Sequence, residues 1–368
     1  MIPMLSICCG GGWIVANSTD GSIPQEGNVN MKYKVSVFLV TALAVFPVHA
    51  DTGKVFGSSG LHGSRQQART AQTESGQRIW QRDQSYALDL YRQVQSGNVS
   101  AVTELKKSAN SGNRWAALQY GYLAHTGKLP GSGGKPDMAT AIKAYNLSAK
   151  RMDKGRLADI NGNYMAAYNM GLVYYYGHGV AANGAEALRW FRAAESAYRA
   201  PGQHRVFWPA AVYIAQILER GYEVAKNEKE ALEYWERAAK ANEAEGLYGY
   251  GMAILNGKGG VQNPYRAYPV LLNAANRWHV GAMVVLAKYQ GSGDKLREAN
   301  PVDAAKWWTV AAMVDKRYSR QVEKAMAALP AAKQQQVRSQ ARSWLSTHGT
   351  VPKSFDWKQP INTEIPQR

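Results

Sequence analysis

Apolar residues recur at positions i, i+3, i+4 and i+7 through most of the chain between about residues 80 and 345. This spacing places them on one face of an α-helix. In the segment 187–194, for example, Leu188, Phe191 and Ala194 share one face, and the charged residues lie off it. Ala, the strongest helix former, is abundant in these segments. The pattern therefore predicts an almost wholly helical protein in this range.

The helical segments come in pairs, and the pairs repeat along the chain. A small residue stands in the middle of each first segment: Gly121, Gly171, Ala215, Gly251 and Ala287, at spacings of 50, 44, 36 and 36. Each is followed by a second apolar segment, at 141–149, 187–194, 231–239, 267–275 and 304–312. The basic period is 36 residues, lengthened by insertions in the earlier copies. Regular self-similarity of this length is typical of repeat proteins.

Glycine and asparagine mark the expected helix ends. A Gly follows the first segments at Gly127, Gly177, Gly221 and Gly257, where a left-handed C-cap avoids a Cβ clash. Residues Asn183, Asn227 and Asn300 precede second segments, where an N-cap belongs. The mid-helix Gly171 and Gly251 reduce helix propensity, so we expect a neighbouring helix to pass close to them.

One helix pair cannot bury its apolar face alone, so five pairs in series predict an all-α fold, an α-solenoid with one continuous core. The ends of such an array need polar caps. Segments 85–95 and 99–109 are predicted to be helices of an N-terminal cap, and 319–329 and 331–345 helices of a C-terminal cap. Pro330 would stand at the first position of the last helix.

The repeated motif is A-x-x-x-[LM]-G-x-x-Y-x-x-G-x-G-V, followed by A-x-x-W-[FY]-x-x-A-A. It resembles the Sel-1-like repeat family, which is related to tetratricopeptide (TPR) repeats. Residues 166–194 match almost position by position, 210–239 and 246–275 match well, and 115–149 and 280–312 match loosely. The first copy lacks the G-x-G-V ending and carries an insertion at 129–134.

The resemblance implies a non-catalytic adaptor whose first helices line a concave, partner-binding surface. Positions that the motif does not fix then become candidates for partner binding. They are Gln119, Tyr122, Asn169, Tyr176, Tyr213, Gln216, Arg220 and Asn256. This inference rests on analogy between folds, and each position could also be a plain surface side chain.

Residues 31–50 have the three parts of a secretory signal peptide. Lys32 and Lys34 form a positive n-region, Val35–Phe46 is apolar, and Val48–Ala50 provides a cleavage site of the A-x-A type. The apolar stretch is too short for a membrane anchor. We therefore expect Met31 to be the true start, cleavage near Ala50, and a periplasmic or secreted protein.

The predicted organisation has seven parts. They are a non-native upstream extension (1–30), the signal peptide (31–50), a disordered linker (51–78), an N-terminal helical cap (79–113), the repeats (114–313), a C-terminal helical cap (314–346) and an extended tail (347–368). The linker is rich in Gly, Ser, Gln and Arg, so it cannot bury enough apolar surface to fold. The tail contains Pro352, Pro360 and Pro366, so we expect it to be extended or loose.

Charge adds a possible second surface. The 368 residues carry 44 Lys and Arg against 27 acids, a net charge of +17. Between residues 316 and 342 there are seven basic residues and one acid, and Lys316, Arg317 and Arg320 stand first among them. This basic cap can be a docking surface for anions, namely lipid headgroups, an acidic partner or an acidic cell-wall polymer, or simply a solvated face. Nucleic acid would also attract such charge, but the signal peptide argues against it.

No motif for catalysis, cofactor binding or metal binding emerges. The two cysteines, Cys8 and Cys9, adjoin each other, so they support neither a disulfide framework nor a zinc site. His178 lies between two glycines and is interpreted as a solvated loop residue. Tryptophans recur at repeat positions, at Trp190, Trp235, Trp307 and Trp308, where core packing is favoured over a sugar or cofactor site. We predict no enzyme activity, no cofactor and no metal.

The sequence therefore favours an exported scaffold for protein–protein interactions in the bacterial cell envelope. Two alternatives stay open. One is a secreted factor that acts on host or neighbouring cells, and the other is a peptidoglycan-acting enzyme or its regulator. The identity of the partner and the oligomeric state are not encoded in any motif that we find.

Overall fold

The structure is a computed structural model, and it describes residues 78–79, 81–150, 162–198, 206–293, 298–351 and 358–362. All of them belong to the compact unit that spans Ser58–Arg368. Within these ranges the regular structure is helical and no strand occurs. The predicted upstream extension, the signal peptide and residues 51–77 of the predicted linker lie outside the described residues.

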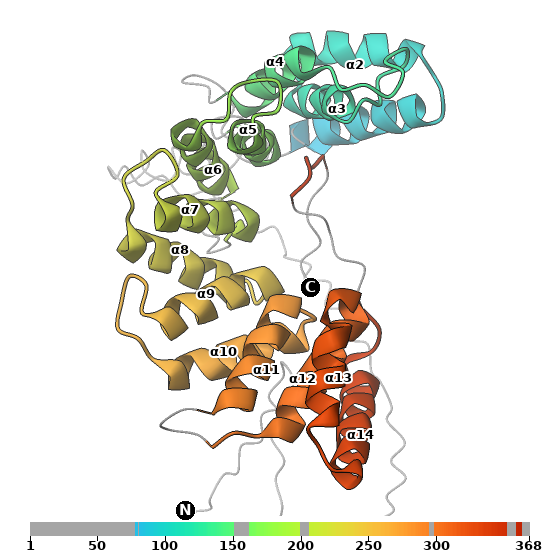
Figure 1. Cartoon of the computed structure of the whole chain (residues 1–368). Coiled ribbons are helices and arrows are strands. Elements are labelled where there is room, and N and C mark those ends of the chain that lie inside the picture. Colours follow the sequence, from blue (N-terminus) through green and yellow to red (C-terminus); the bar gives the residue numbers. More distant parts are fainter. Residues whose placement is uncertain are drawn as a thin grey trace, which may run out of the picture. The chain divides into compact units, whose positions relative to one another are not determined.

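The helices follow one another along the chain (Figure 1). Residues 81–95 are helical and precede α2. The helices that follow are α2 (Ser100–Asn110), α3 (Arg114–His125), α4 (Met138–Ala149), α5 (Tyr164–Tyr176), α6 (Gly184–Tyr198), α7 (Trp208–Arg220), α8 (Glu228–Lys240), α9 (Ala244–Asn256), α10 (Pro264–Asn276), α11 (Val280–Ser292), α12 (Pro301–Val314), a 3₁₀ turn at Lys316–Tyr318, α13 (Ser319–Ala327) and α14 (Ala331–His348).

Helices pack mainly against their neighbours in sequence. The most extensive contacts join α3 to α4, α5 to α6, α7 to α8, α9 to α10 and α11 to α12. Each pair also packs against the next, through α4 with α5, α6 with α7, α8 with α9 and α10 with α11. This nearest-neighbour packing is the organisation of a helical solenoid. The predicted all-α solenoid of five helix pairs is confirmed.

The predicted helix ends are largely confirmed. Gly177, Gly221 and Gly257 take left-handed conformations at the C-caps of α5, α7 and α9. The side chains of all three predicted Asn N-caps accept hydrogen bonds from main-chain N–H groups at the start of α6, α8 and α12. Two details differ. Helix α3 ends one residue earlier, with Thr126 at the C-cap before Gly127. Pro330 lies at the N-cap of α14 instead of the first helical position.

Close helix contacts explain the glycines inside the first helices. A Cβ on Gly171 would stand 2.5 Å from the ring of Phe191 in α6, and one on Gly251 would stand 2.8 Å from Leu271 in α10. Gly121 repeats the arrangement, with the ring of Tyr145 in α4 at 2.8 Å. A large side chain of the second helix therefore fills the space that each glycine leaves, as we predicted for Gly171 and Gly251.

The recurring tryptophans pack in or against the core, as predicted. Trp307 and Trp235 are buried, with exposed fractions of 2% and 5%. Trp190 and Trp308 are partly buried and pack against the clusters formed by the repeats. Their positions in the repeats thus reflect packing between helices.

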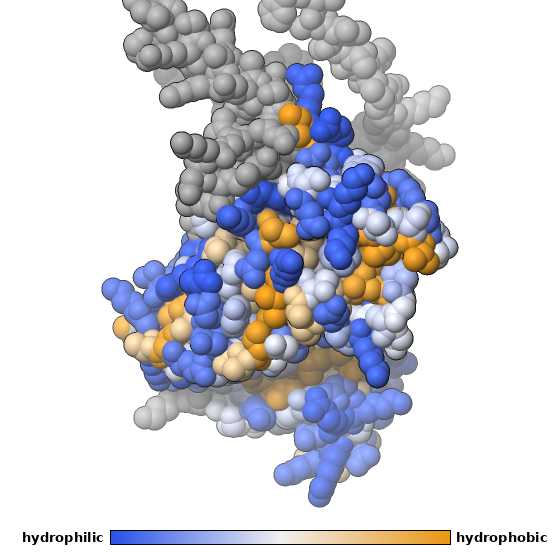
Figure 2. All heavy atoms as spheres, turned by 90° about the horizontal axis from the view of Figure 1, so that it is seen from above, coloured by the Kyte–Doolittle hydropathy of each residue, from blue (hydrophilic) through white to orange (hydrophobic). Residues whose placement is uncertain are grey.

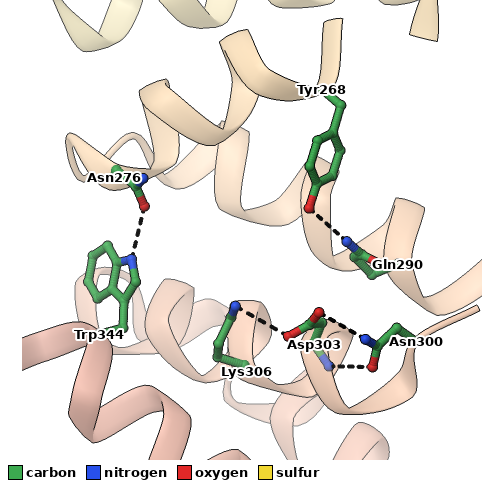
Figure 3. Close-up of polar contacts among 7 residues, drawn as sticks. All are labelled: Tyr268, Asn276, Gln290, Asn300, Asp303, Lys306 and Trp344. Carbon is green, nitrogen blue, oxygen red and sulfur yellow. Dashed lines mark hydrogen bonds and ion pairs between the residues drawn. The ribbon is translucent and has the colours of Figure 1, made fainter. Parts of the chain in front are cut away.

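Specific hydrogen bonds hold the last repeat and the closing helices together (Figure 3). The indole N–H of Trp344 in α14 donates to Oδ1 of Asn276, at the end of α10, at 3.0 Å. Gln290 in α11 donates to the hydroxyl of Tyr268 in α10 at 2.8 Å. At the start of α12, Asn300 and Asp303 bond each other through side-chain and main-chain groups. These contacts tie α14 to α10 and fix the start of the last second helix.

The face shown in Figure 2 is mostly hydrophilic, with separate hydrophobic areas among the polar residues. Among the described residues, no helix combines the length and the apolar composition that a membrane crossing requires.

Candidate functional site

Two first-helix side chains hold a short segment from the far end of the chain. Asn169 of α5 donates from Nδ2 to the carbonyl of Ile361, and its Oδ1 accepts from the main-chain N–H of Ile361, both at 2.8 Å. Gln119 of α3 donates from Nε2 to the carbonyl of Asn362, and its Oε1 accepts from the side-chain amide of Asn362, both at 2.8 Å. We call Gln119 and Asn169 the carboxamide pair. Figure 1 shows residues 358–362 as a short dark red piece beside α3.

The contact is buried. Gln119 and Asn169 have no exposed surface, and Ile361 and Asn362 keep only 3% and 8% of theirs. A buried carboxamide without partners costs about 1–3 kcal/mol. The pair is therefore satisfied here by another stretch of chain, with three of the four bonds made to main-chain atoms of residues 361 and 362. Within the tail that we expected to be extended or loose, Ile361 and Asn362 are non-helical but held in place by these hydrogen bonds.

A polar network lies behind the carboxamide pair. Burial raises the pKa of the Tyr145 hydroxyl, and the neighbouring Asn169 side chain opposes this effect. The Tyr145 hydroxyl lies 3.4 Å from Nδ1 of His125, and Nε2 of His125 lies 3.3 Å from Nδ1 of His178. Burial lowers the pKa of His125 to about 4, with a further contribution from His178. His125 is therefore neutral at pH 7 and can accept a hydrogen bond at one ring nitrogen.

A charged contact joins α9 to the N-cap of α11. Burial by itself would raise the pKa of the Glu245 carboxyl, but the hydrogen bond from His279 and the charges of His279 and Lys358 hold it below its usual range. His279 Nε2 lies 3.2 Å from Oε2 of Glu245. Ile361 binds α5 and Asn362 binds α3, so the chain runs opposite to the order of the repeats at these two residues.

The other first-helix candidates differ in accessibility. Tyr213 is buried and stacks on Phe191 with ring centroids 4.5 Å apart. Its hydroxyl bonds that of Tyr176 at 2.8 Å, and Tyr176 is 43% exposed. Tyr122 and Gln216 are half-buried. Arg220 and Asn256 are exposed at the ends of α7 and α9.

The three basic-cap candidates are exposed. Lys316 and Arg317 lie in the 3₁₀ turn, and Arg320 lies at the start of α13. Arg317 pairs with Asp315 at 2.6 Å and keeps 84% of its side chain exposed. The hydrogen bonds from Arg317 lower the pKa of the Asp315 carboxyl. The basic cap and the carboxamide pair are thus built from different helices.

Metal ligation has no support among the described residues, where no group of three or more His, Cys, Asp or Glu side chains could hold an ion. His178 is exposed, as expected for a loop residue. It also stacks on Tyr176 with the ring centroids 5.5 Å apart. The contact of His178 with His125 spans 53 positions in sequence, and no motif indicated it.

Sequence reasoning named both members of the carboxamide pair but missed their occupant. Ile361 and Asn362 belong to a segment without helical periodicity, beside Pro360. They meet side chains that stand 192 and 243 positions earlier. No local pattern could indicate such a contact.

Comparisons with known proteins bear on the repeats. The Sel1 repeat family model matches residues 165–197, 208–243, 244–268 and 280–314. It does not extend over α3 and α4, where the sequence lacks the G-x-G-V ending. No curated protein matches the chain.

The solved structures similar to this chain include two repeat proteins. One is a protective antigen of uropathogenic Escherichia coli displaying an SLR fold, with TM-score 0.56 and 21% identity over 71% of this chain. This chain spans about half of that protein, 53% of its length. The other is a Sel1 repeat protein from Oxalobacter formigenes, with TM-score 0.47 and 22% identity, covering 62% of this chain and 84% of that one. The first likeness agrees with the helical-repeat fold described above.

Proposed function

Because this chain carries four Sel1 repeats, and such repeats generally mediate protein–protein interactions without catalysis, we propose that it is an exported adaptor of the bacterial cell envelope. Its first helices bind a partner protein, and the carboxamide pair is the centre of that binding face. The basic cap provides a second docking surface for an anionic partner or polymer.

One observation carries the binding part of this proposal. Gln119 and Asn169, which sequence reasoning selected as partner-binding candidates, are engaged with the main chain of a non-helical segment. A side-chain carboxamide offers one donor and one acceptor side by side, so it can pair with the N–H and C=O of one residue. Asn169 does this with Ile361. The first helices thus have the chemistry needed to bind peptide backbone.

Site-specific photo-crosslinking tests the binding face. A photoreactive residue replaces Tyr176, which is 43% exposed in first helix α5, in cells that produce the protein. The matched control replaces Tyr265, which is 60% exposed in second helix α10. We expect a discrete protein adduct in the envelope from position 176 and none from 265. Equal adducts from both positions, or none from 176, would refute the proposed face.

Export and the absence of catalysis have their own tests. Signal-peptide features at 31–50 support export, so a chain started at Met31 should give a mature N-terminus at Asp51. Unprocessed protein in the cytosol would contradict this. The mature protein, incubated with purified peptidoglycan, should release no soluble fragments, whereas release would favour a cell-wall enzyme.

A further inference from the structure

Residues 358–362 contact the repeats as a bound ligand would. The segment is not helical, and it has two buried residues, Ile361 and Asn362, after two exposed ones, Lys358 and Gln359. Its hydrogen bonds go to side chains of α3 and α5. Such a segment resembles a short peptide anchored by two adjacent residues.

The helices that receive the segment have extensive contacts of their own. Helix α3 packs on α4 through Gly121 and Tyr145, and α5 packs on α6 through Gly171 and Phe191. None of these contacts involves residues 358–362. The helices of the binding face should therefore stay folded when the segment leaves. This is necessary if another peptide is to replace the segment.

The contacts define the chemistry of an occupant. Asn169 pairs with the main chain of residue 361, so any residue except Pro can supply those groups. The side chain of Ile361 is 3% exposed within the apolar cluster of the repeats, which selects an aliphatic residue. The side chain of Asn362 must donate to Oε1 of Gln119, which selects a carboxamide. The preferred occupant thus presents an aliphatic residue followed by Asn.

We propose that residues 358–362 occupy, within their own chain, the binding face for a partner's peptide, and that this peptide presents an aliphatic residue followed by Asn in place of Ile361 and Asn362. The inference rests on the proposed function. It adds the class of ligand and a form of autoinhibition, in which the chain's own segment blocks the binding face. The partner must displace the chain's own segment. A tethered segment competes at a millimolar effective concentration, so the intact chain binds free peptide weakly.

A peptide with the sequence of residues 354–366, labelled with a fluorophore, tests the proposal by fluorescence anisotropy. The full mature chain is compared with its Ile361→Asp variant, in which a charge replaces the buried aliphatic side chain and should release the segment. We expect the variant to bind the peptide at least about tenfold more tightly than the unaltered chain. Asn362→Ala is a milder second variant that removes only the bond to Gln119, and it should have a smaller effect in the same direction.

Controls identify the site. In the Ile361→Asp background, Asn169→Ala should weaken peptide binding at least about tenfold, because it removes two main-chain hydrogen bonds. Asn273→Ala is the control, since the side chain of this exposed residue of α10 donates to Asn242, away from residues 358–362. A peptide carrying Asp at position 361 should not bind, whereas a peptide carrying Ala at the exposed position 359 should bind normally.

Three outcomes would overturn the inference. One is equal binding of the peptide by the unaltered chain and both variants. The second is no binding to an Ile361→Asp variant that keeps its helical circular dichroism. The third is an unaltered chain that is dimeric by light scattering while the variant is monomeric, because the segment would then be exchanged between two copies. Crosslinking at position 176 tests the proposed adaptor function independently of peptide binding. Failure of the peptide-binding proposal can therefore be distinguished from failure of the proposed function.

Discussion

Gly171→Ala tests the close contact between the two helices of a repeat. The new methyl would stand 2.5, 2.6 and 2.8 Å from three ring atoms of Phe191, about 1 Å inside the usual carbon–carbon separation. Phe191 has little room to yield, because it is fully buried and stacks on Tyr213 at 4.5 Å with an interplanar angle of 1°. The extra carbon therefore has to displace a helix.

The expected effect is the difference between two terms. Overpacking of a core costs about 1–3 kcal/mol. Replacing Gly by Ala inside a helix returns about 0.5–1 kcal/mol. The difference spans about 0–2.5 kcal/mol. Because Phe191 is fully buried and has little room to move, we expect a net destabilisation of about 1–2 kcal/mol and a fall in the melting temperature of about 2–8 °C for an array of this size.

Thermal unfolding followed by circular dichroism measures the effect, with Gly291→Ala as the matched control. A Cβ at Gly291 of α11 would be 3.6 Å from Ala304, an ordinary contact, so this variant should match or exceed the unaltered protein by up to about 1 kcal/mol. Hydrogen exchange should locate the damage in α5 to α7, since repeats transmit strain mainly to their neighbours. A Gly171→Ala protein as stable as Gly291→Ala would refute the reasoning.

Three further predictions concern protonation, charge and capping. The pKa of His125 falls from 6.5 to about 4 on folding, so the stability that its neutral ring contributes is fully present above pH 6.5 and is lost as the pH falls toward 4, by up to about 3 kcal/mol. In urea unfolding, the free energy of unfolding of a His125→Asn variant should therefore fall less steeply over this pH range. Replacing Lys316, Arg317 and Arg320 together by Glu should leave the melting temperature nearly unchanged but weaken retention on anionic envelope material, and added salt should weaken retention too. Retention that responds to neither change would show that the basic cap is only a solvated face. Asn300→Ala should destabilise the protein by about 0.5–2 kcal/mol in urea unfolding, because the N–H of Asp303 loses its acceptor, and no change would mean that another group caps α12.

Local sequence was sufficient to predict the helices and their order. Helical periodicity, the Gly at helix ends and the Asn N-caps act within a few residues, so they can be recognised without knowing the fold. The close helix contacts at the glycines were also predictable. A Gly inside a helix costs stability, so its recurrence at the same repeat position indicates that a neighbouring helix packs there, as Phe191 does against Gly171. The caps at Thr126 and Pro330 each differ by one residue from the prediction, because periodicity fixes a helix end only to within a residue or two.

The site was predictable only in part. The repeat analogy directed attention to non-motif positions of the first helices, and two of these, Gln119 and Asn169, form the carboxamide pair. The same reasoning also selected Tyr213, but its ring is buried and stacks on Phe191, so it is not accessible to a partner. Periodicity tells which face of a helix is apolar, but it does not tell whether a polar residue there finds a partner far along the chain.

The contact between Gln119 and Asn362 also changes the folding topology of the molecule. The helix pairs interact almost entirely with sequence neighbours, so each could open with little effect on distant ones. The bonds to Ile361 and Asn362 join positions 192 and 243 residues apart and close loops that contain all helices from α6 to α14. Closing so long a loop costs entropy that grows only slowly with its length. Ile361 and Asn362 consequently couple to the first two repeats, so these two residues and helices α3 and α5 should gain or lose protection from hydrogen exchange together.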